Sequence, residues 1–172
     1  MSFDDGFVDI TERGLDAGIR LGDSIAQDMV SVRLTESEPI AILGSPNYLK
    51  ERGIPKEVAD LVSHDCIRFR FPSTGLIFRW ELLVGGQLEE LEVGGPCTVN
   101  DTASMLALAL EGMGLAYVLA STAKHHVKSG ALKQVLQDAS PVLPGFHLYY
   151  TSRRQLPMKV RCFVDFMRAQ LK

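Results

Sequence analysis

Apolar and polar positions along the chain follow two alternating patterns. Short apolar runs predict β-strands, and they lie at residues 17–21, 29–34, 39–43, 115–120 and 146–151. Between these runs, apolar residues recur at the three- and four-residue spacing that is typical of helices with one buried face. Because strands and helices alternate, we expect an α/β fold with parallel strands. The run at 39–43 is continuously apolar, which favours a strand that is buried on both faces.

Residues that begin and end helices follow directly after the 39–43 run. Ser45 can accept hydrogen bonds from the free N–H groups of a first helical turn. Pro46 suits the first helical position, where its missing N–H costs nothing. Gly53 is expected to end this helix, and Pro55 is expected to begin another that runs through Leu61.

Three further helices are predicted downstream. The first has an apolar stripe and ends at two glycines: Met105, Leu106, Ala109, Leu110 and Met113, then Gly112 and Gly114. The second is a short basic helix over Ser121–Ser129, which Gly130 ends. The third begins at Pro157, and its stripe consists of Val160, Phe163, Val164, Met167 and Leu171.

A β-hairpin is predicted between these helical regions. Cys66–Phe71 forms a strand, and the segments 78–84 and 87–93 then flank Gly85-Gly86. This glycine pair tolerates the positive φ angles of a tight two-residue turn. Side chains alternate along a strand, so Trp80, Leu82 and Val84 are expected to share one face.

The composition is that of a globular protein without a nucleic-acid-binding surface. Of the 172 residues, 46% are hydrophobic, which is enough for a sizeable core. The formal net charge is -3, whereas a free-standing nucleic-acid binder carries a basic excess. No apolar run reaches the length of a membrane span, the amino terminus does not resemble a signal peptide, and three separated cysteines make no disulfide framework. We therefore expect a cytoplasmic protein with no membrane association and no direct DNA binding.

An ordered series of segments carries a family resemblance. Leu15–Pro55 contains GIRLG, two predicted strands and the helix motif SPNYLKERGIP. It is followed by HDCIRFR (64–70), VND (99–101), EGMGLAYV (111–118) and LYYTSRRQLP (148–157). The series resembles the effector-binding domain of LysR-type transcriptional regulators. The resemblance implies a fold similar to type 2 periplasmic binding proteins, in which two α/β lobes surround a ligand-binding cleft.

The resemblance also implies how the chain is divided. The winged helix-turn-helix and the first strand and helix of the effector domain have no counterpart in the sequence, so we expect an amino-terminally truncated domain. We expect residues 1–43 and 145–172 to form an incomplete lobe I and residues 44–144 to form lobe II. The chain would cross between lobes near Leu43-Gly44 and Pro144-Gly145. A homo-oligomer is expected, and it would reach DNA only through a helix-turn-helix domain absent from this chain.

Candidate effector-binding residues are expected at the cleft, because ligands of open α/β sheets bind beyond the carboxyl ends of strands. Asn100, Asp101 and Thr102 begin a predicted helix, where free N–H groups attract polar or anionic atoms. Plain N-capping is an equal alternative, and a cap can also contact a ligand. In the family, residues at this helix start line the cleft. Asp4-Asp5-Gly6 resembles a family loop that also borders it.

Arginine and aromatic side chains supply the other candidates. Arg20 can bind a carboxylate through its planar guanidinium, or it can pair with Asp16 or Asp23 near the surface. Arg70 and Phe71 end a predicted strand and would supply a cation and an aromatic wall, although the face that carries Arg70 is either the cleft or solvent. These residues lead us to expect that the effector is an organic acid.

Catalytic and metal sites are tested by spacing. Ser63-His64-Asp65-Cys66 contains the residue types of a nucleophilic triad, but adjacent residues cannot face one another around a reaction centre. His125-His126 lacks the spacing of zinc ligands, and no glycine-rich phosphate loop is present. We therefore expect no catalytic residue, metal or cofactor. The predicted function is effector sensing in a LysR-type regulator. The alternatives are a solute-binding protein or an enzyme on the same fold, or an interaction module without a ligand.

Overall fold

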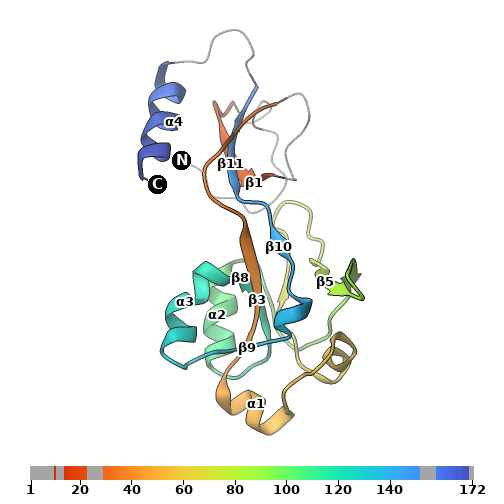
Figure 1. Cartoon of the computed structure of the whole chain (residues 1–172). Coiled ribbons are helices and arrows are strands. Elements are labelled where there is room, and N and C mark those ends of the chain that lie inside the picture. The colour runs from red at the N-terminus through yellow and green to blue at the C-terminus, as the bar shows by residue number, and fades with distance from the viewer. Residues whose placement is uncertain (1–9, 11–13, 23–28, 152–157, 171–172) are drawn as a thin grey trace. The chain divides into compact units, whose positions relative to one another are not determined.

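The computed structural model of the chain describes residues 10, 14–22, 29–151 and 158–170 (Figure 1). They divide into two compact units. Unit 1 contains Pro39–Val142, and unit 2 contains the described residues between Phe7 and Glu38 and between Leu143 and Lys172. The units therefore divide after Glu38 and after Val142, a few residues from the predicted crossings. The assignment of residues 1–43 and 145–172 to lobe I and of 44–144 to lobe II stays a prediction.

A four-stranded sheet forms the centre of unit 1. Strand β3 (Glu38–Gly44) pairs antiparallel with β8 (Ala116–Leu119) and with β9 (Lys133–Val135), and it also borders β10 (Val142–Leu143). The predicted run at 39–43 is confirmed as a buried strand, because Ile40 through Leu43 are at most 3% exposed. Burial on both faces explains why every side chain of this run is apolar.

Parallel pairing is confined to a short part of unit 1. Strand β4 (Arg68–Phe69) runs parallel to β7 (Thr98–Val99), and Cys66 forms a parallel bridge with Leu115. The other strand pairs whose direction is described are antiparallel. The expectation of generally parallel strands was therefore wrong. Alternating strands and helices do not settle strand direction, which depends on pairing between segments far apart in the sequence.

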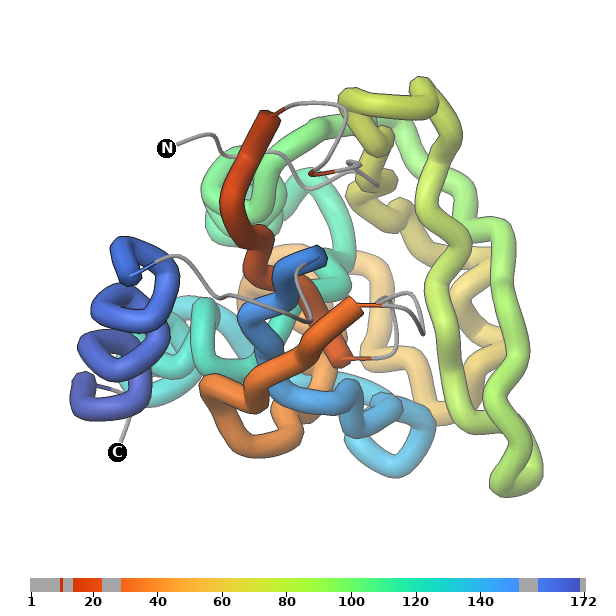
Figure 2. The backbone as a smooth tube through the Cα atoms, turned by 90° about the horizontal axis from the view of Figure 1, so that it is seen from above, coloured from red at the N-terminus to blue at the C-terminus, as the bar shows by residue number. Residues whose placement is uncertain are grey.

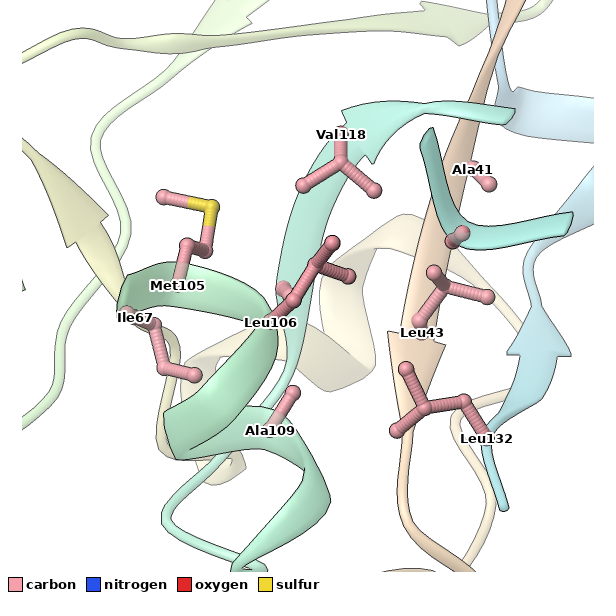
Figure 3. Packing of buried hydrophobic residues seen from close by; sticks show 10 residues of the cluster. Ala41, Leu43, Ile67, Met105, Leu106, Ala109, Val118 and Leu132 are labelled. Carbon is pink, nitrogen blue, oxygen red and sulfur yellow. The ribbon is translucent and has the colours of Figure 1, made fainter. Parts of the chain in front are cut away.

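Two helices cover one face of this sheet. Helix α2 (Thr102–Leu110) and helix α3 (Ala120–Lys128) confirm two of the predicted helices. Figure 3 shows Leu106 of α2 directed toward the strands that carry Val118 and Leu43. The cluster consists of Ala41, Leu43, Ile67, Met105, Leu106, Ala109, Ala116, Val118, Ala123 and Leu132. Met113 lies beyond the end of α2 and is 43% exposed, so it does not extend the buried stripe.

Helix α1 (Pro46–Arg52) forms where its end signals predict it. The Ser45 hydroxyl accepts a hydrogen bond from the Tyr48 N–H at 3.2 Å, and Gly53 ends the helix at a φ of 89°. The helix expected from Pro55 is instead a 3-10 helix, η2 (Val58–Ser63). The Asp60 carboxylate accepts hydrogen bonds from the Lys56 and Glu57 N–H groups, which holds this short turn together.

The predicted hairpin consists of β5 (Trp80–Val84) and β6 (Gln87–Leu91). Gly85 and Gly86 have φ angles of 59° and 85°, as the tight turn requires. Trp80 and Leu82 are fully buried, but Val84 at the tip is 37% exposed. Figures 1 and 2 show the hairpin on the side of unit 1 that is opposite to α3.

The described residues of unit 2 form a three-stranded antiparallel sheet and one helix. Strand β11 (Phe146–Tyr150) lies between β1 (Gly18–Leu21) and β2 (Val30–Arg33), and helix α4 (Met158–Gln170) follows. The core consists of Leu34, Leu148, Val160 and Val164. Phe163, predicted in the buried stripe of α4, is 39% exposed, and Leu171 lies outside the described residues. No helix in the described ranges is long and apolar enough to cross a membrane.

Candidate functional site

The parallel strands β4 and β7 end at the same edge of unit 1. Arg68 pairs with Thr98 and Phe69 with Val99, and the Arg70 N–H donates to the Val99 carbonyl at 2.7 Å. The residues that follow the two strands are therefore neighbours. Arg70 and Phe71 continue from β4, and Asn100, Asp101 and Thr102 continue from β7 into α2. Five of the six predicted site residues thus lie together, and their role in binding stays a prediction.

Asp101 is the N-cap of α2. Its Oδ1 atom accepts a hydrogen bond from the Ser104 N–H at 2.8 Å, so the capping interpretation is confirmed. This hydrogen bond lowers the pKa of the Asp101 carboxyl below its usual value. The carboxylate satisfies one of the free N–H groups of the first turn and adds a negative charge to the edge. Asn100 is exposed and Thr102 is half-buried, so both can contact a molecule in solvent.

Arg70 is exposed and is oriented by the loop that follows β4. Its Nη1 atom donates to the Gly75 carbonyl at 2.9 Å. Three backbone hydrogen bonds close the same loop: Phe71 N–H to Leu76, Gly75 N–H to Phe71, and Phe78 N–H to Phe69. A guanidinium has five N–H donors, and one carbonyl uses only one of them. Arg70 therefore presents a positive charge with further donors at the edge.

Phe71 belongs to a row of aromatic rings. It meets the rings of Phe69 and Phe78 edge to face, at centroid distances of 5.5 and 5.9 Å. The row continues from Phe78 to Tyr117 at 5.5 Å and from Tyr117 to Trp80 at 5.2 Å. Phe71 is half-buried and Trp80 is fully buried. The only tryptophan of the chain is thus connected through packed rings to the edge where Arg70 lies.

Arg20 belongs to unit 2, whereas the other five predicted residues belong to unit 1. It lies in β1, and its guanidinium carbon is 5.5 Å from the centroid of the Tyr149 ring. Of its two alternative partners, Asp16 forms an ion pair with Lys159 at 2.7 Å, and Asp23 lies outside the described residues. Its effector-binding role stays a prediction. Asp4-Asp5-Gly6 also lies outside the described residues.

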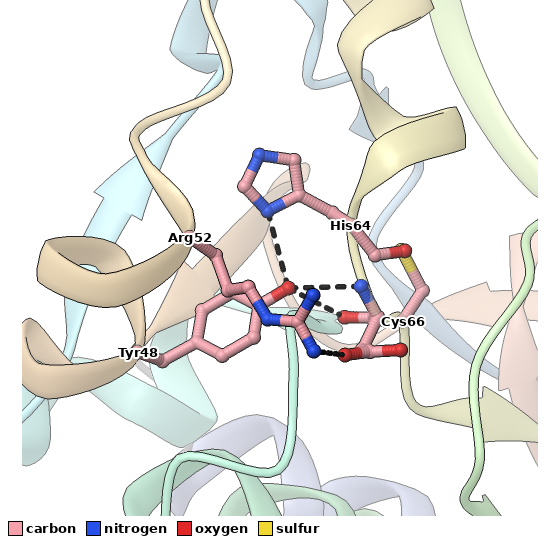
Figure 4. A network of polar contacts seen from close by, with 5 residues as sticks. Tyr48, Arg52, His64 and Cys66 are labelled. Carbon is pink, nitrogen blue, oxygen red and sulfur yellow. Dashed lines mark hydrogen bonds and ion pairs between the residues drawn. The ribbon is translucent and has the colours of Figure 1, made fainter.

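The SHDC segment is part of a structural network around Tyr48 (Figure 4). The Asp65 N–H donates to the Tyr48 hydroxyl at 2.9 Å, and the same hydroxyl lies 3.1 Å from Nδ1 of His64 and 3.2 Å from the Asp65 carbonyl oxygen. The Arg52 guanidinium donates to the Asp65 carboxylate at 3.0 Å. The network ties α1 to the segment that leads into β4.

Burial gives the titratable groups of this network the opposite character to a reactive triad. It raises the pKa of the Cys66 thiol to about 12, so the thiol stays protonated at neutral pH. It also lowers the pKa of His64 and raises that of Tyr48. A nucleophilic cysteine needs a lowered pKa, so the Cys66 thiol lacks the ionisation that such a nucleophile requires.

No metal-binding cluster is found among the described residues. No three histidine, cysteine, aspartate or glutamate side chains gather there closely enough to hold an ion. His125 and His126 lie next to each other on α3, with ring centroids 5.8 Å apart.

Sequence reasoning missed two features of the β4–β7 edge, namely the hydrogen bond from Arg70 to Gly75 and the rings of Phe78 and Tyr117. Each depends on a loop or a strand pairing that no local pattern reveals.

Comparisons with known proteins point to one family. The model described as LysR substrate binding domain matches residues 2–172. The HTH-type transcriptional regulator PgrR of Escherichia coli (strain K12) is 34% identical over 165 residues, which are 96% of this chain and 55% of PgrR. The uncharacterized HTH-type transcriptional regulator YcaN of the same strain is 33% identical over 168 residues, or 98% of this chain and 54% of YcaN. The chain spans about half the length of these relatives.

A solved structure shares the fold. The CrgA regulatory domain, from a LysR-type transcriptional regulator of Neisseria meningitidis, superposes with a TM-score of 0.77. The match covers 98% of this chain and 81% of the CrgA regulatory domain, at 22% sequence identity. The predicted type 2 periplasmic-binding-protein-like α/β fold is thereby confirmed.

Proposed function

The chain belongs to the LysR substrate-binding-domain family, and we propose that it binds a small-molecule effector at the β4–β7 edge of unit 1. Domains of this family are the effector-binding regulatory domains of LysR-type regulators, which bind small-molecule effectors and form oligomers. The observation that carries the proposal is the parallel pairing of β4 and β7, which brings Arg70 and Phe71 next to the first residues of α2. Ligands of α/β folds bind beyond the carboxyl ends of such strands.

The chemistry of the edge favours an organic acid with an aromatic or other flat apolar part. The Arg70 guanidinium can donate two parallel hydrogen bonds to a carboxylate, which is the geometry that arginine provides best. Phe71 offers an apolar ring beside it. Asn100 and Thr102 can donate or accept hydrogen bonds and so orient the polar part of the ligand. The Asp101 charge repels a second anionic group, which favours a monocarboxylate.

Regulation follows from differential affinity. An effector that binds one state of the regulator more tightly than another shifts the population toward that state. In the whole regulator, this shift would be carried to DNA through a helix-turn-helix domain, and the protein would act in the cytoplasm. The relatives support this part of the proposal, because PgrR and YcaN are HTH-type transcriptional regulators.

Thermal unfolding with paired ligands tests the proposal. Benzoate and other monocarboxylates are compared with the matched neutral amides, such as benzamide. A carboxylate at a hundred times its Kd should stabilise the folded chain by about 2.7 kcal/mol. Because Trp80 is packed against the aromatic row, the same titration should also change its fluorescence. Equal shifts from acids and amides, or shifts from neutral sugars alone, would exclude an anion-binding edge.

Variants locate the ligand. Arg70→Gln removes the guanidinium charge at the proposed edge. Arg79→Gln is the matched control, because Arg79 lies directly before β5 and pairs with Glu90 and Glu92. The carboxylate shift should be lost in the first variant and kept in the second. Arg20→Gln tests the remaining predicted residue in unit 2. A shift that survives Arg70→Gln and disappears in Arg20→Gln would move the site away from the β4–β7 edge.

A further inference from the structure

The face of β4 that is opposite to α2 carries two arginines. Phe69 packs against the core cluster to which α2 contributes, and side chains alternate along a strand. Arg68 and Arg70 therefore lie together on the other face, with their Cα atoms about 6.5–7 Å apart. Thr98 of β7 pairs with Arg68 in register, so its side chain lies on this face as well. Two cations and a hydroxyl group thus share one face beside the β4–β7 edge.

Arg68 is a half-buried cation whose buried atom lacks an acceptor. Its Nε atom is buried and has no hydrogen-bond partner among the described residues. Buried N–H groups nearly always have an acceptor, because one without a partner has lost its hydration and gained nothing in return. Arg33, Arg52 and Arg79, in contrast, each pair with a carboxylate. The described part of the chain therefore leaves the Nε–H of Arg68 to an acceptor from elsewhere.

An acceptor on a bound ligand would satisfy Arg68 without breaking an existing contact of its Nε atom. Arg79 would have to leave Glu90 and Glu92 to do the same. Arg68 is half-buried rather than fully enclosed, so its side chain can turn toward a molecule at the edge. Nothing that the Nε–H donates to in the described residues holds it back from this turn.

The two side chains on this face define what kind of group they fit. A guanidinium only donates hydrogen bonds, whereas a threonine hydroxyl both donates and accepts them. Thr98 is half-buried beside Arg68. A group that accepts from the arginine and donates to the threonine oxygen would use both, and a hydroxyl group does so. A carboxylate or an ether oxygen accepts only, and a methyl group does neither.

We propose that Arg68 and Thr98 bind a hydroxyl group of the effector, which is therefore a hydroxy-substituted carboxylate. This inference rests on the proposed function, in which Arg70 binds the carboxylate. The effector hydroxyl oxygen accepts a hydrogen bond from the Arg68 guanidinium, and its hydrogen is donated to the Oγ1 atom of Thr98. An analogue with a methyl group in the same place leaves the arginine donor unpaired, so the site discriminates against it.

Paired ligands that differ in one group test this inference. The probes are 3- and 4-hydroxybenzoate and the corresponding methylbenzoates, with Kd measured by isothermal titration calorimetry. The unaltered chain should bind at least one hydroxybenzoate about tenfold or more tightly than its methyl counterpart, since a hydrogen bond to a charged donor is gained. Arg68→Met keeps an apolar stem and removes every donor, so the preference should fall to about twofold or less. Thr98→Val should weaken the preference in the same direction.

The stability of the unliganded chain separates a binding role from a structural one. Arg68→Met replaces a buried donor that lacks an acceptor by an apolar group, so the melting temperature should stay the same or rise. Arg52→Met is the matched control, because it removes an arginine that pairs with Asp65, and it should keep the hydroxyl preference. A melting temperature that drops by several degrees in Arg68→Met would show that Arg68 supports the fold, and it would overturn the inference.

The remaining outcomes distinguish this inference from the proposed function on which it rests. If neither benzoate nor any of its derivatives binds, both are overturned. If benzoate binds but the hydroxyl and methyl compounds bind equally, or if the hydroxyl preference survives Arg68→Met, only the role of Arg68 is overturned. A preference that is lost equally in Arg52→Met and Arg68→Met would have the same meaning, since the effect would then not be local to this face.

Discussion

Unit 1 buries its central strand on both faces, whereas two of the three strands in unit 2 contain no buried residue. In β3, Ile42 and Leu43 are fully buried, while β1 and β2 contain only half-buried and exposed positions. Among the described residues, the core of unit 1 is larger than that of unit 2, in which α4 packs against the three-stranded sheet. A thin core leaves less apolar area to offset the entropy of ordering the chain. The difference indicates that, within the described part of the chain, unit 1 supplies most of the packing energy.

The largest expected effect compares two leucines that are equally buried. Leu43 in β3 and Leu148 in β11 are both 0% exposed. Leu43→Ala should lower the free energy of unfolding by about 4 kcal/mol, because a densely packed core collapses little around a cavity. Leu148→Ala should cost about 2–3 kcal/mol, because a smaller core can relax around it. Urea unfolding of both variants measures the difference. Equal costs, or a larger cost at Leu148, would break the comparison.

Tyr48→Phe tests whether unit 1 also depends on a polar network. The change removes the hydroxyl that accepts the Asp65 N–H and contacts His64, so it should cost about 1–3 kcal/mol. Tyr150→Phe in unit 2 is the matched control, since the Tyr150 hydroxyl has no hydrogen bond among the described residues; it should change stability by less than about 0.5 kcal/mol. Chemical unfolding of the two variants gives both values. Similar losses at the two tyrosines would mean that the network adds nothing beyond ring packing.

Local signals in the sequence predicted the parts of unit 1 that local chemistry determines. Ser45, Pro46 and Gly53 set the ends of α1 through the hydrogen bonds of their own turns. Gly85-Gly86 sets the hairpin turn by its positive φ angles. Strand direction was mispredicted because β3 pairs with β8, more than 70 residues away, and no pattern inside either strand encodes that direction.

The candidate site was predictable in kind but not in arrangement. Asp101 was expected as a cap by its residue type, and the structure confirms it. The proximity of Arg70 to Asp101 follows from pairing of two-residue strands, which are too short to give a pattern. In unit 2, the predicted stripe of α4 was too wide. The small sheet covers Val160 and Val164 and leaves Phe163 partly exposed.

Replacement of the α2 cap should have a smaller effect than either interior change. Asp101→Ala removes the acceptor of the Ser104 N–H and should cost about 1 kcal/mol. Asp101→Asn keeps a capping oxygen without the charge and should cost at most about 0.5 kcal/mol. Thermal unfolding measures both. If the asparagine variant is as unstable as the alanine variant, the charge of Asp101 rather than its hydrogen bond stabilises the edge of unit 1.

The smallest expected effect is a change in how stability depends on pH. Burial lowers the pKa of His64 in the folded chain. Below about pH 6.5 the unfolded chain therefore takes up a proton at this position before the folded chain does. The free energy of unfolding should then fall as the pH drops below that value, and above it His64 should contribute no pH dependence.

His64→Gln should flatten the profile between pH 5 and pH 7. The carboxyls of Asp60 and Asp101 stay ionised in this window, because their pKa values are lowered from ordinary values that already lie below it. His125→Gln on the exposed side of α3 is the matched variant, and urea midpoints across this window give the slopes. A slope that persists in His64→Gln would place the proton uptake outside the Tyr48 network.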